Sequence, residues 1–72
     1  AAIDQRIIFR RAYALSADAI ALCHNHPSGS LSVSPADIEA TRAIARSCAL
    51  LGFRLTDHIV IAGDDYTPVD WR

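Results

Sequence analysis

The apolar residues in the first third of the chain are spaced first as in a helix and then as in a strand. Within residues 4–15 they recur every three to four positions, as on one helix face, at Ile8, Ala12 and Leu15. Asp4 stands where such a helix would be capped, although the run Ile7-Ile8-Phe9 also suits a short strand. Residues 18–23 are apolar after Asp18, and this compact run predicts a strand buried on both faces.

The middle of the chain carries the clearest signals for a helix. Ser34 is a preferred N-cap, Pro35 suits the first helical position, and Asp37 completes a capping box. Gly52 stands where a left-handed C-cap is expected. The positions between them form one apolar stripe, with Thr41 filling a gap: Ile38, Ile44, Ala45, Cys48 and Leu51.

The remaining residues predict two strands joined by a tight turn. Residues 58–62 are a β-type run, Gly63-Asp64-Asp65 is turn chemistry, and residues 66–71 would pair as a final strand. Pro68 limits that last strand to an edge of the sheet. The order helix, strand, loop, helix, strand, strand predicts an α/β unit whose sheet is incomplete.

Composition fits one small globular domain. The chain has 72 residues, of which 51% are hydrophobic and 21% are charged. Its net charge is −1, so charge gives no support for nucleic-acid binding. Cys23 and Cys48 have apolar neighbours, and we expect two buried thiols in a reducing compartment. The sequence shows no membrane span and no signal peptide, which favours a cytoplasmic protein.

Two histidines and one aspartate form a candidate metal site. His24 and His26 are two positions apart at the end of a predicted strand, so their side chains share one face. Asp37 starts the next helix, and the polar loop between can fold its carboxylate back over the imidazoles. Two His and one carboxylate leave a coordination position open, as in catalytic zinc sites. The alternative is that the His-x-His pair is incidental and that Ser34 and Asp37 only cap the helix.

The same residues resemble a known motif. His24-Asn25-His26-Pro27-Ser28-Gly29, followed by Ser34 and Asp37, resembles the JAMM metalloprotease motif of MPN+/JAB domains. Residues 24–29 and 34–41, together with residues 57–61 and 6–12, resemble the RadC branch of this superfamily, the family of DNA repair protein RadC. The resemblance implies an α+β three-layer, cytidine-deaminase-like fold with a mixed sheet and flanking helices. Residues 1–72 would then be part of one such domain, without its N-terminal strands.

The resemblance also implies a chemistry. His24, His26 and Asp37 would bind Zn²⁺, and water on the metal would attack an amide or isopeptide bond of a protein or peptide substrate. Ser34 would help to stabilise the oxyanion that forms. The residues that would shape the ligand loop are Asn25, Pro27, Ser28 and Gly29. His58 is expected to be structural and not a fourth ligand.

One part of the family pattern is absent from this sequence. JAMM enzymes use an upstream glutamate as general base, but no Glu precedes His24. Glu39 lies two positions after Asp37 on the helix and so points away from it. The chain also lacks Met, and we expect a fragment that binds metal without efficient hydrolysis. The alternatives are a non-catalytic module in DNA repair or recombination, making protein or nucleic-acid contacts, and an inert fragment. Exposed strand edges predict a homodimer.

Overall fold

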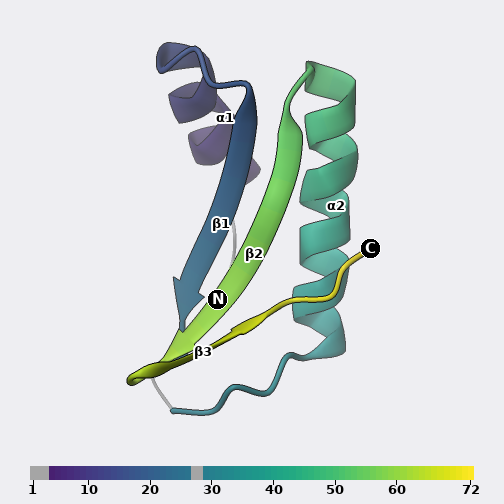
Figure 1. Cartoon of the computed structure of the whole chain (residues 1–72). Helices are drawn as coiled ribbons and strands as arrows, with labels where there is room; N and C mark the ends of the chain where they lie inside the picture. The colour runs from purple at the N-terminus through teal and green to yellow at the C-terminus, as the bar shows by residue number, and fades with distance from the viewer. Residues whose placement is uncertain (1–3, 27–28) are drawn as a thin grey trace.

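The computed structural model describes residues 4–26 and 29–72 and contains two helices and three strands. In chain order the elements are α1 (Gln5–Ala14), β1 (Ala19–Asn25), α2 (Pro35–Leu51), β2 (Arg54–Ala62) and β3 (Asp65–Pro68). The sheet has the order β1-β2-β3, with β1 parallel to β2 and β3 antiparallel to β2 (Figure 1). The chain therefore has an α+β fold with a mixed sheet, and the predicted order of elements is confirmed.

Helix α1 forms where the apolar spacing predicts it, and this excludes a strand at residues 7–9. The Asp4 side chain caps the helix by accepting the N–H of Arg6 at 3.0 Å. Phe9 and Ala12 are the buried residues of the helix. The prediction was wrong for Leu15, which is 71% exposed because the helix ends at Ala14 and Leu15 is its C-cap.

Helix α2 has the predicted cap at each end. Ser34 and Asp37 form the capping box, and Gly52 is the C-cap in the left-handed conformation, with φ +85°. The helix buries Thr41, Ile44 and Cys48. The predicted stripe was wrong at its end, because Leu51 remains 44% exposed in the last turn.

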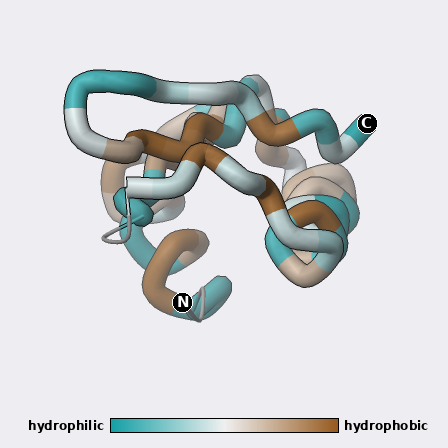
Figure 2. Tube along the Cα trace, turned by 90° about the horizontal axis from the view of Figure 1, so that it is seen from below, coloured by the Kyte–Doolittle hydropathy of each residue, from teal (hydrophilic) through white to brown (hydrophobic). Residues whose placement is uncertain are grey.

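The core lies between the two helices and one face of the sheet. Figure 2 shows both helices on the same side of the strands. The buried residues that meet there come from α1, α2, β2 and the residue before β2: Phe9, Ala12, Ile44, Cys48, Phe53 and Leu55. The prediction that the strand at residues 18–23 is buried on both faces was wrong, because β1 alternates between exposed and half-buried positions. Cys23 is accordingly exposed, whereas Cys48 is buried as predicted.

An irregularity in the β1–β2 pairing decides which face of β2 meets the helices. Ile20 pairs with Leu55 but Ala21 pairs with Asp57, so Thr56 is an extra residue in β2. Leu55 is buried before this bulge, and His58, Val60 and Ala62 are buried after it. Without the extra residue, strict alternation would place Asp57 inside and His58 outside.

Strand β3 is shorter than the predicted run of residues 66–71. It ends at Pro68, as expected for an edge strand, and the Val69 N–H then donates to the His58 carbonyl at 2.8 Å. Gly63 adopts φ +61° in the turn before it. Within residues 4–26 and 29–72, neither helix has the length and apolar character needed to cross a membrane.

Candidate metal centre

The candidate ligands come together from the end of β1 and the first turn of α2. His24 lies in β1 and His26 follows the last residue of that strand, and their rings lie 4.8 Å apart between centroids. Asp37 is the third residue of α2, and the loop after β1 returns the chain so that this turn lies beside the imidazoles. One ligand atom from each of the three residues lies within 4.8 Å of the others. The structure therefore brings together His24, His26 and Asp37, the three ligands that the sequence predicted.

The donor set and its dimensions suit zinc. His24 Nε2 lies 2.9 Å from His26 Nε2, and His26 Nε2 lies 4.0 Å from Asp37 Oδ2. Ligands bound tetrahedrally at about 2.0–2.1 Å are separated by about 3.3 Å. These two separations lie on either side of this value and the third pair of ligand atoms is at most 4.8 Å apart, so the three side chains could hold an ion after side-chain rotation. Two imidazoles and a carboxylate are also the donors of open zinc sites.

The capping box holds Asp37 in place. Its Oδ2 atom accepts the backbone N–H of Ser34 at 3.1 Å. That bond is the main reason why the pKa of the Asp37 carboxyl lies below its ordinary value. Partial burial acts in the opposite direction, and positive charge on the nearby His24 and His26 lowers the pKa further. The same atom, Oδ2, both accepts the cap bond and lies 4.0 Å from His26 Nε2. An oxygen with two lone pairs can do both.

Ser34 lies at the edge of the centre as the other half of the capping box. Its Oγ accepts the backbone N–H of Asp37 at 3.1 Å. Because a hydroxyl accepts and also donates, this bond leaves the Ser34 proton for a second partner. The geometry is thus compatible with both functions that the sequence suggested for Ser34.

His26 is oriented by the loop that follows β1. Its Nδ1 atom lies 2.9 Å from the carbonyl oxygen of Ser30, and a carbonyl only accepts, so His26 donates. A neutral His26 therefore bears its lone pair on Nε2, the atom that faces His24 and Asp37. Asn25 is exposed, and Gly29 adopts φ +79° as its N–H donates to the His26 carbonyl. Two of the predicted loop-shaping residues, Pro27 and Ser28, lie outside the described residues.

Two buried residues behind the ligands were not assigned to the site from the sequence. His58 Nε2 lies 2.7 Å from His24 Nδ1, and His58 Nδ1 lies 2.7 Å from Thr41 Oγ1. His58 is 2% exposed and Thr41 is 0% exposed. Burial lowers the pKa of His58 below its ordinary value, and the charge of a protonated His24 would lower it further. One available signal was that Thr41 follows Asp37 by four positions and so shares its helix face.

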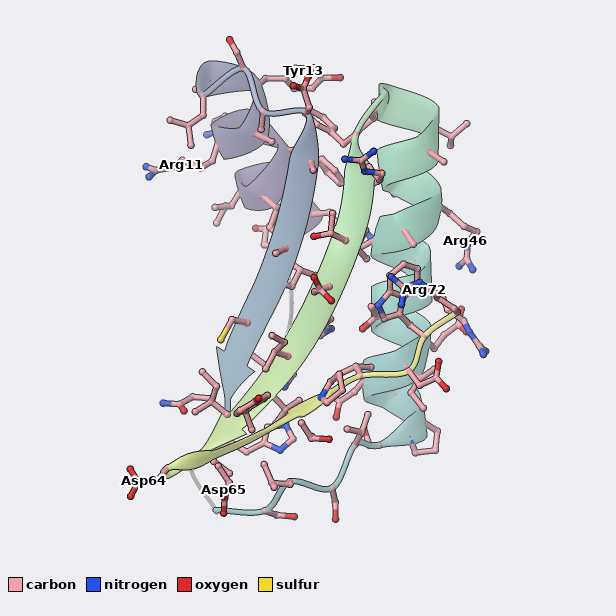
Figure 3. The ribbon with its side chains drawn as sticks, in the orientation of Figure 1. Arg11, Tyr13, Arg46, Asp64, Asp65 and Arg72 are labelled. Carbon is pink, nitrogen blue, oxygen red and sulfur yellow. The ribbon has the colours of Figure 1, made fainter. Side chains whose placement is uncertain are left out.

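Glu39 lies away from the centre, as its position in the helix predicted. Its carboxylate is 64% exposed and pairs with Arg46 at 3.3 Å. Arg46 extends from the side of α2 opposite to the sheet (Figure 3). The one glutamate of this sequence is therefore not placed to act on a group bound by the two histidines.

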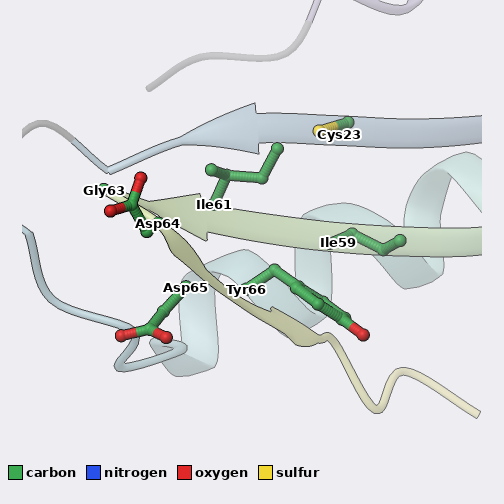
Figure 4. Close-up of a pocket in the computed structure, with 7 residues that line it drawn as sticks. All are labelled: Cys23, Ile59, Ile61, Gly63, Asp64, Asp65 and Tyr66. Carbon is green, nitrogen blue, oxygen red and sulfur yellow. The ribbon is translucent and has the colours of Figure 1, made fainter.

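Two hollows border the sheet. One, of about 420 Å³, lies between α1 and β1 and is lined by Asp4, Ile7, Ile8, Leu22, Cys23, His24 and His58, so it reaches the candidate centre. The other, of about 450 Å³, lies by the β2–β3 turn, and its mostly apolar lining includes Cys23, Ile61 and Tyr66 (Figure 4). Only the first of these two hollows touches a candidate ligand.

Comparison with known proteins agrees with the motif. The sequence profile of the family described as RadC-like JAB domain matches residues 1–70. A UPF0758 protein of Porphyromonas gingivalis is 48% identical over 62 residues, which are 86% of this chain and 27% of that protein. UPF0758 proteins of Finegoldia magna and Pseudomonas fluorescens are 41% and 40% identical over 88% and 90% of this chain, and over 28% and 29% of their own lengths. The chain thus spans just over a quarter of the length of these curated relatives.

Proposed function

This chain belongs to the RadC-like JAB domain family, and we propose that it is the zinc-binding part of a hydrolase that cleaves an amide or isopeptide bond in a protein or peptide. The observation that carries the proposal is the convergence of His24 Nε2, His26 Nε2 and the Asp37 carboxylate within 4.8 Å of one another. The donor set leaves one position of a tetrahedral ion for substrate or water.

The residues of the chain have separate roles in this proposal. His24, His26 and Asp37 bind the ion, and the Ser34 N–H holds the carboxylate by its bond to Oδ2. Zinc held by these residues would act as a Lewis acid and would lower the pKa of a coordinated water to about 7, which would provide a nucleophile at neutral pH. The Ser34 hydroxyl donates a hydrogen bond to the oxygen on which negative charge develops during attack on the carbonyl.

The proposed reaction also needs a general base, and this sequence does not supply one at the site. Glu39 is exposed and paired with Arg46, so it does not face the ligands. The 72-residue chain is therefore proposed to bind zinc without efficient hydrolysis. The alternative of a nucleic-acid-binding module has no support from the net charge of −1.

Zinc titration of the purified chain tests the proposal. We expect one zinc ion per chain, measured by calorimetry, and loss of that binding in His24→Ala. Cys23→Ser is the matched control, because Cys23 is an exposed thiol next to His24 that could bind zinc on its own. Binding that survives in His24→Ala but is lost in Cys23→Ser would contradict the proposal.

A further inference from the structure

His58 and Thr41 connect two of the proposed ligands from behind. His24 Nδ1 lies 2.7 Å from His58 Nε2, and His58 Nδ1 lies 2.7 Å from Thr41 Oγ1. Thr41 Oγ1 then donates to the backbone carbonyl of Asp37 at 2.7 Å. We call this series the His24–His58–Thr41 relay. It starts at a ligand on β1, crosses β2 and ends on the backbone of the ligand in α2.

The end of the relay at Asp37 fixes the direction of its hydrogen bonds when His58 and His24 are neutral. Two oxygens 2.7 Å apart need a proton between them, and the carbonyl has none, so the Thr41 proton points to Asp37. Thr41 Oγ1 must then accept, which makes His58 Nδ1 the donor. A neutral imidazole has one N–H, so His58 Nε2 bears a lone pair and accepts a hydrogen bond from the N–H at His24 Nδ1. The lone pair of His24 is thereby left on Nε2.

His26, the neighbouring ligand, is held in the same tautomer by a separate hydrogen bond. His26 Nδ1 donates to the Ser30 carbonyl, so the His26 lone pair is also on Nε2. The two Nε2 atoms lie 2.9 Å apart, and if both imidazoles are neutral in these tautomers, neither bears a proton on Nε2. Two lone pairs at this distance repel each other unless a cation is shared between them. The Asp37 carboxylate, whose Oδ2 lies 4.0 Å from His26 Nε2, adds negative charge beside the two lone pairs.

We infer that His58 and Thr41 are positioning residues that set the tautomer and ring orientation of His24, so that its Nε2 lone pair faces the metal beside Asp37. The inference rests on the proposed function, since it concerns the same zinc site. Neither residue is itself a ligand. Both side chains are almost fully buried, so their hydrogen bonds to each other and to His24 satisfy polar atoms that water cannot reach. The bulge at Thr56 is needed for the His24–His58–Thr41 relay, because it turns the His58 side chain inward.

Zinc affinity in a matched set of variants tests the inference. His58→Phe removes the acceptor for His24, and Thr41→Val removes the hydroxyl at nearly constant volume. Each is expected to weaken zinc binding by about 10–100-fold, the usual effect of losing a partner of a metal-bound histidine. In His58→Gln the amide oxygen can accept the His24 proton, so the loss should be below about tenfold. Ile44→Val, a buried change in the same helix as Thr41, is the control for altered packing and should leave the affinity unchanged.

The tautomer itself is measured without metal. Nitrogen–proton correlation spectra of the metal-free wild-type chain should show the His24 proton on Nδ1, and the spectra of His58→Phe should show a mixture of tautomers. A His24 proton on Nε2 in the wild-type chain would overturn the inference. So would His58→Phe binding zinc as tightly as Ile44→Val does. A wild-type chain without zinc affinity contradicts the proposed function, and the spectra then still decide the tautomer separately.

Discussion

Two hydrogen bonds join Ser34 and Asp37, because the backbone N–H of each residue donates to a side-chain oxygen of the other at 3.1 Å. The Asp37 oxygen in this exchange is also the one that lies 4.0 Å from His26 Nε2. Helix capping and the positioning of a proposed metal ligand are thus one structural feature. A change to either residue should therefore alter both the stability of the chain and its affinity for zinc.

Removing the Ser34 hydroxyl should weaken the start of α2. We expect Ser34→Ala to lower the free energy of unfolding by about 0.5–2 kcal/mol, because the Asp37 N–H loses its acceptor. Urea denaturation followed by circular dichroism measures this. Ser32→Ala, an exposed serine in the same loop, is the control and should change the stability by less than about 0.5 kcal/mol. Equal losses in the two variants would contradict the assigned cap.

Asp37→Asn should separate capping from metal binding. The amide oxygen of Asn can still accept the Ser34 N–H, so we expect a loss of stability of only about 1 kcal/mol or less. The negative charge and the anionic ligand are removed, so zinc affinity should fall by more than about 100-fold, beyond the range seen for partners outside the ligand shell. Calorimetry and denaturation of the same sample measure both. Unchanged zinc affinity would exclude Asp37 as a ligand.

The left-handed C-cap of α2 gives a test of the fold away from the metal centre. Gly52 has φ +85°, where a side chain with a Cβ is strained, although no atom would clash with it. Gly52→Ala should cost roughly 1–2 kcal/mol, and Gly52→Asn should cost less because Asn tolerates this conformation. Thermal denaturation compares the variants. Gly52→Ala as stable as the wild type would contradict the observed end of the helix.

The two cysteines should differ in reactivity towards an alkylating reagent. Cys23 is exposed, whereas Cys48 is buried, and burial raises the pKa of the Cys48 thiol above its ordinary value. Since the thiolate is the reactive form, a raised pKa keeps Cys48 protonated to higher pH than an ordinary thiol. At pH 8, mass spectrometry should detect one adduct, at Cys23, and a second only after unfolding in urea. Rapid modification of Cys48 in the folded chain would contradict the observed core.

Much of the candidate site could be predicted from local sequence signals. The His24 and His26 side chains share a face because the period of a strand is two, and the Ser34–Asp37 box is a pattern within four residues. Their meeting needs only a strand, a loop and a helix that are consecutive in the chain. The Gly52 cap is equally local. These features were therefore visible before any tertiary contact was known.

What could not be predicted depends on long-range packing. His58 faces inward because of the extra residue at Thr56, and a bulge in the pairing of two separate strands leaves no clear pattern in the sequence. The sequence predicts only that Thr41 fills a gap in the apolar stripe, because its hydrogen-bond partner His58 comes from a strand 17 residues later. Cys23 was expected to be buried from its apolar neighbours, but only one face of β1 meets the helices. In each case the neighbouring element decides the outcome.

The proposed zinc centre is tested most directly by the X-ray absorption spectrum of zinc bound to the 72-residue chain at one equivalent. A centre formed by His24, His26 and Asp37 should give two imidazole nitrogens at about 2.0–2.1 Å and oxygen ligands at about 2.0–2.2 Å, with no sulfur. The imidazole signal should decrease in His24→Ala and stay unchanged in Cys23→Ser. A sulfur ligand at about 2.3 Å, or a spectrum without imidazole, would contradict a zinc centre formed by His24, His26 and Asp37.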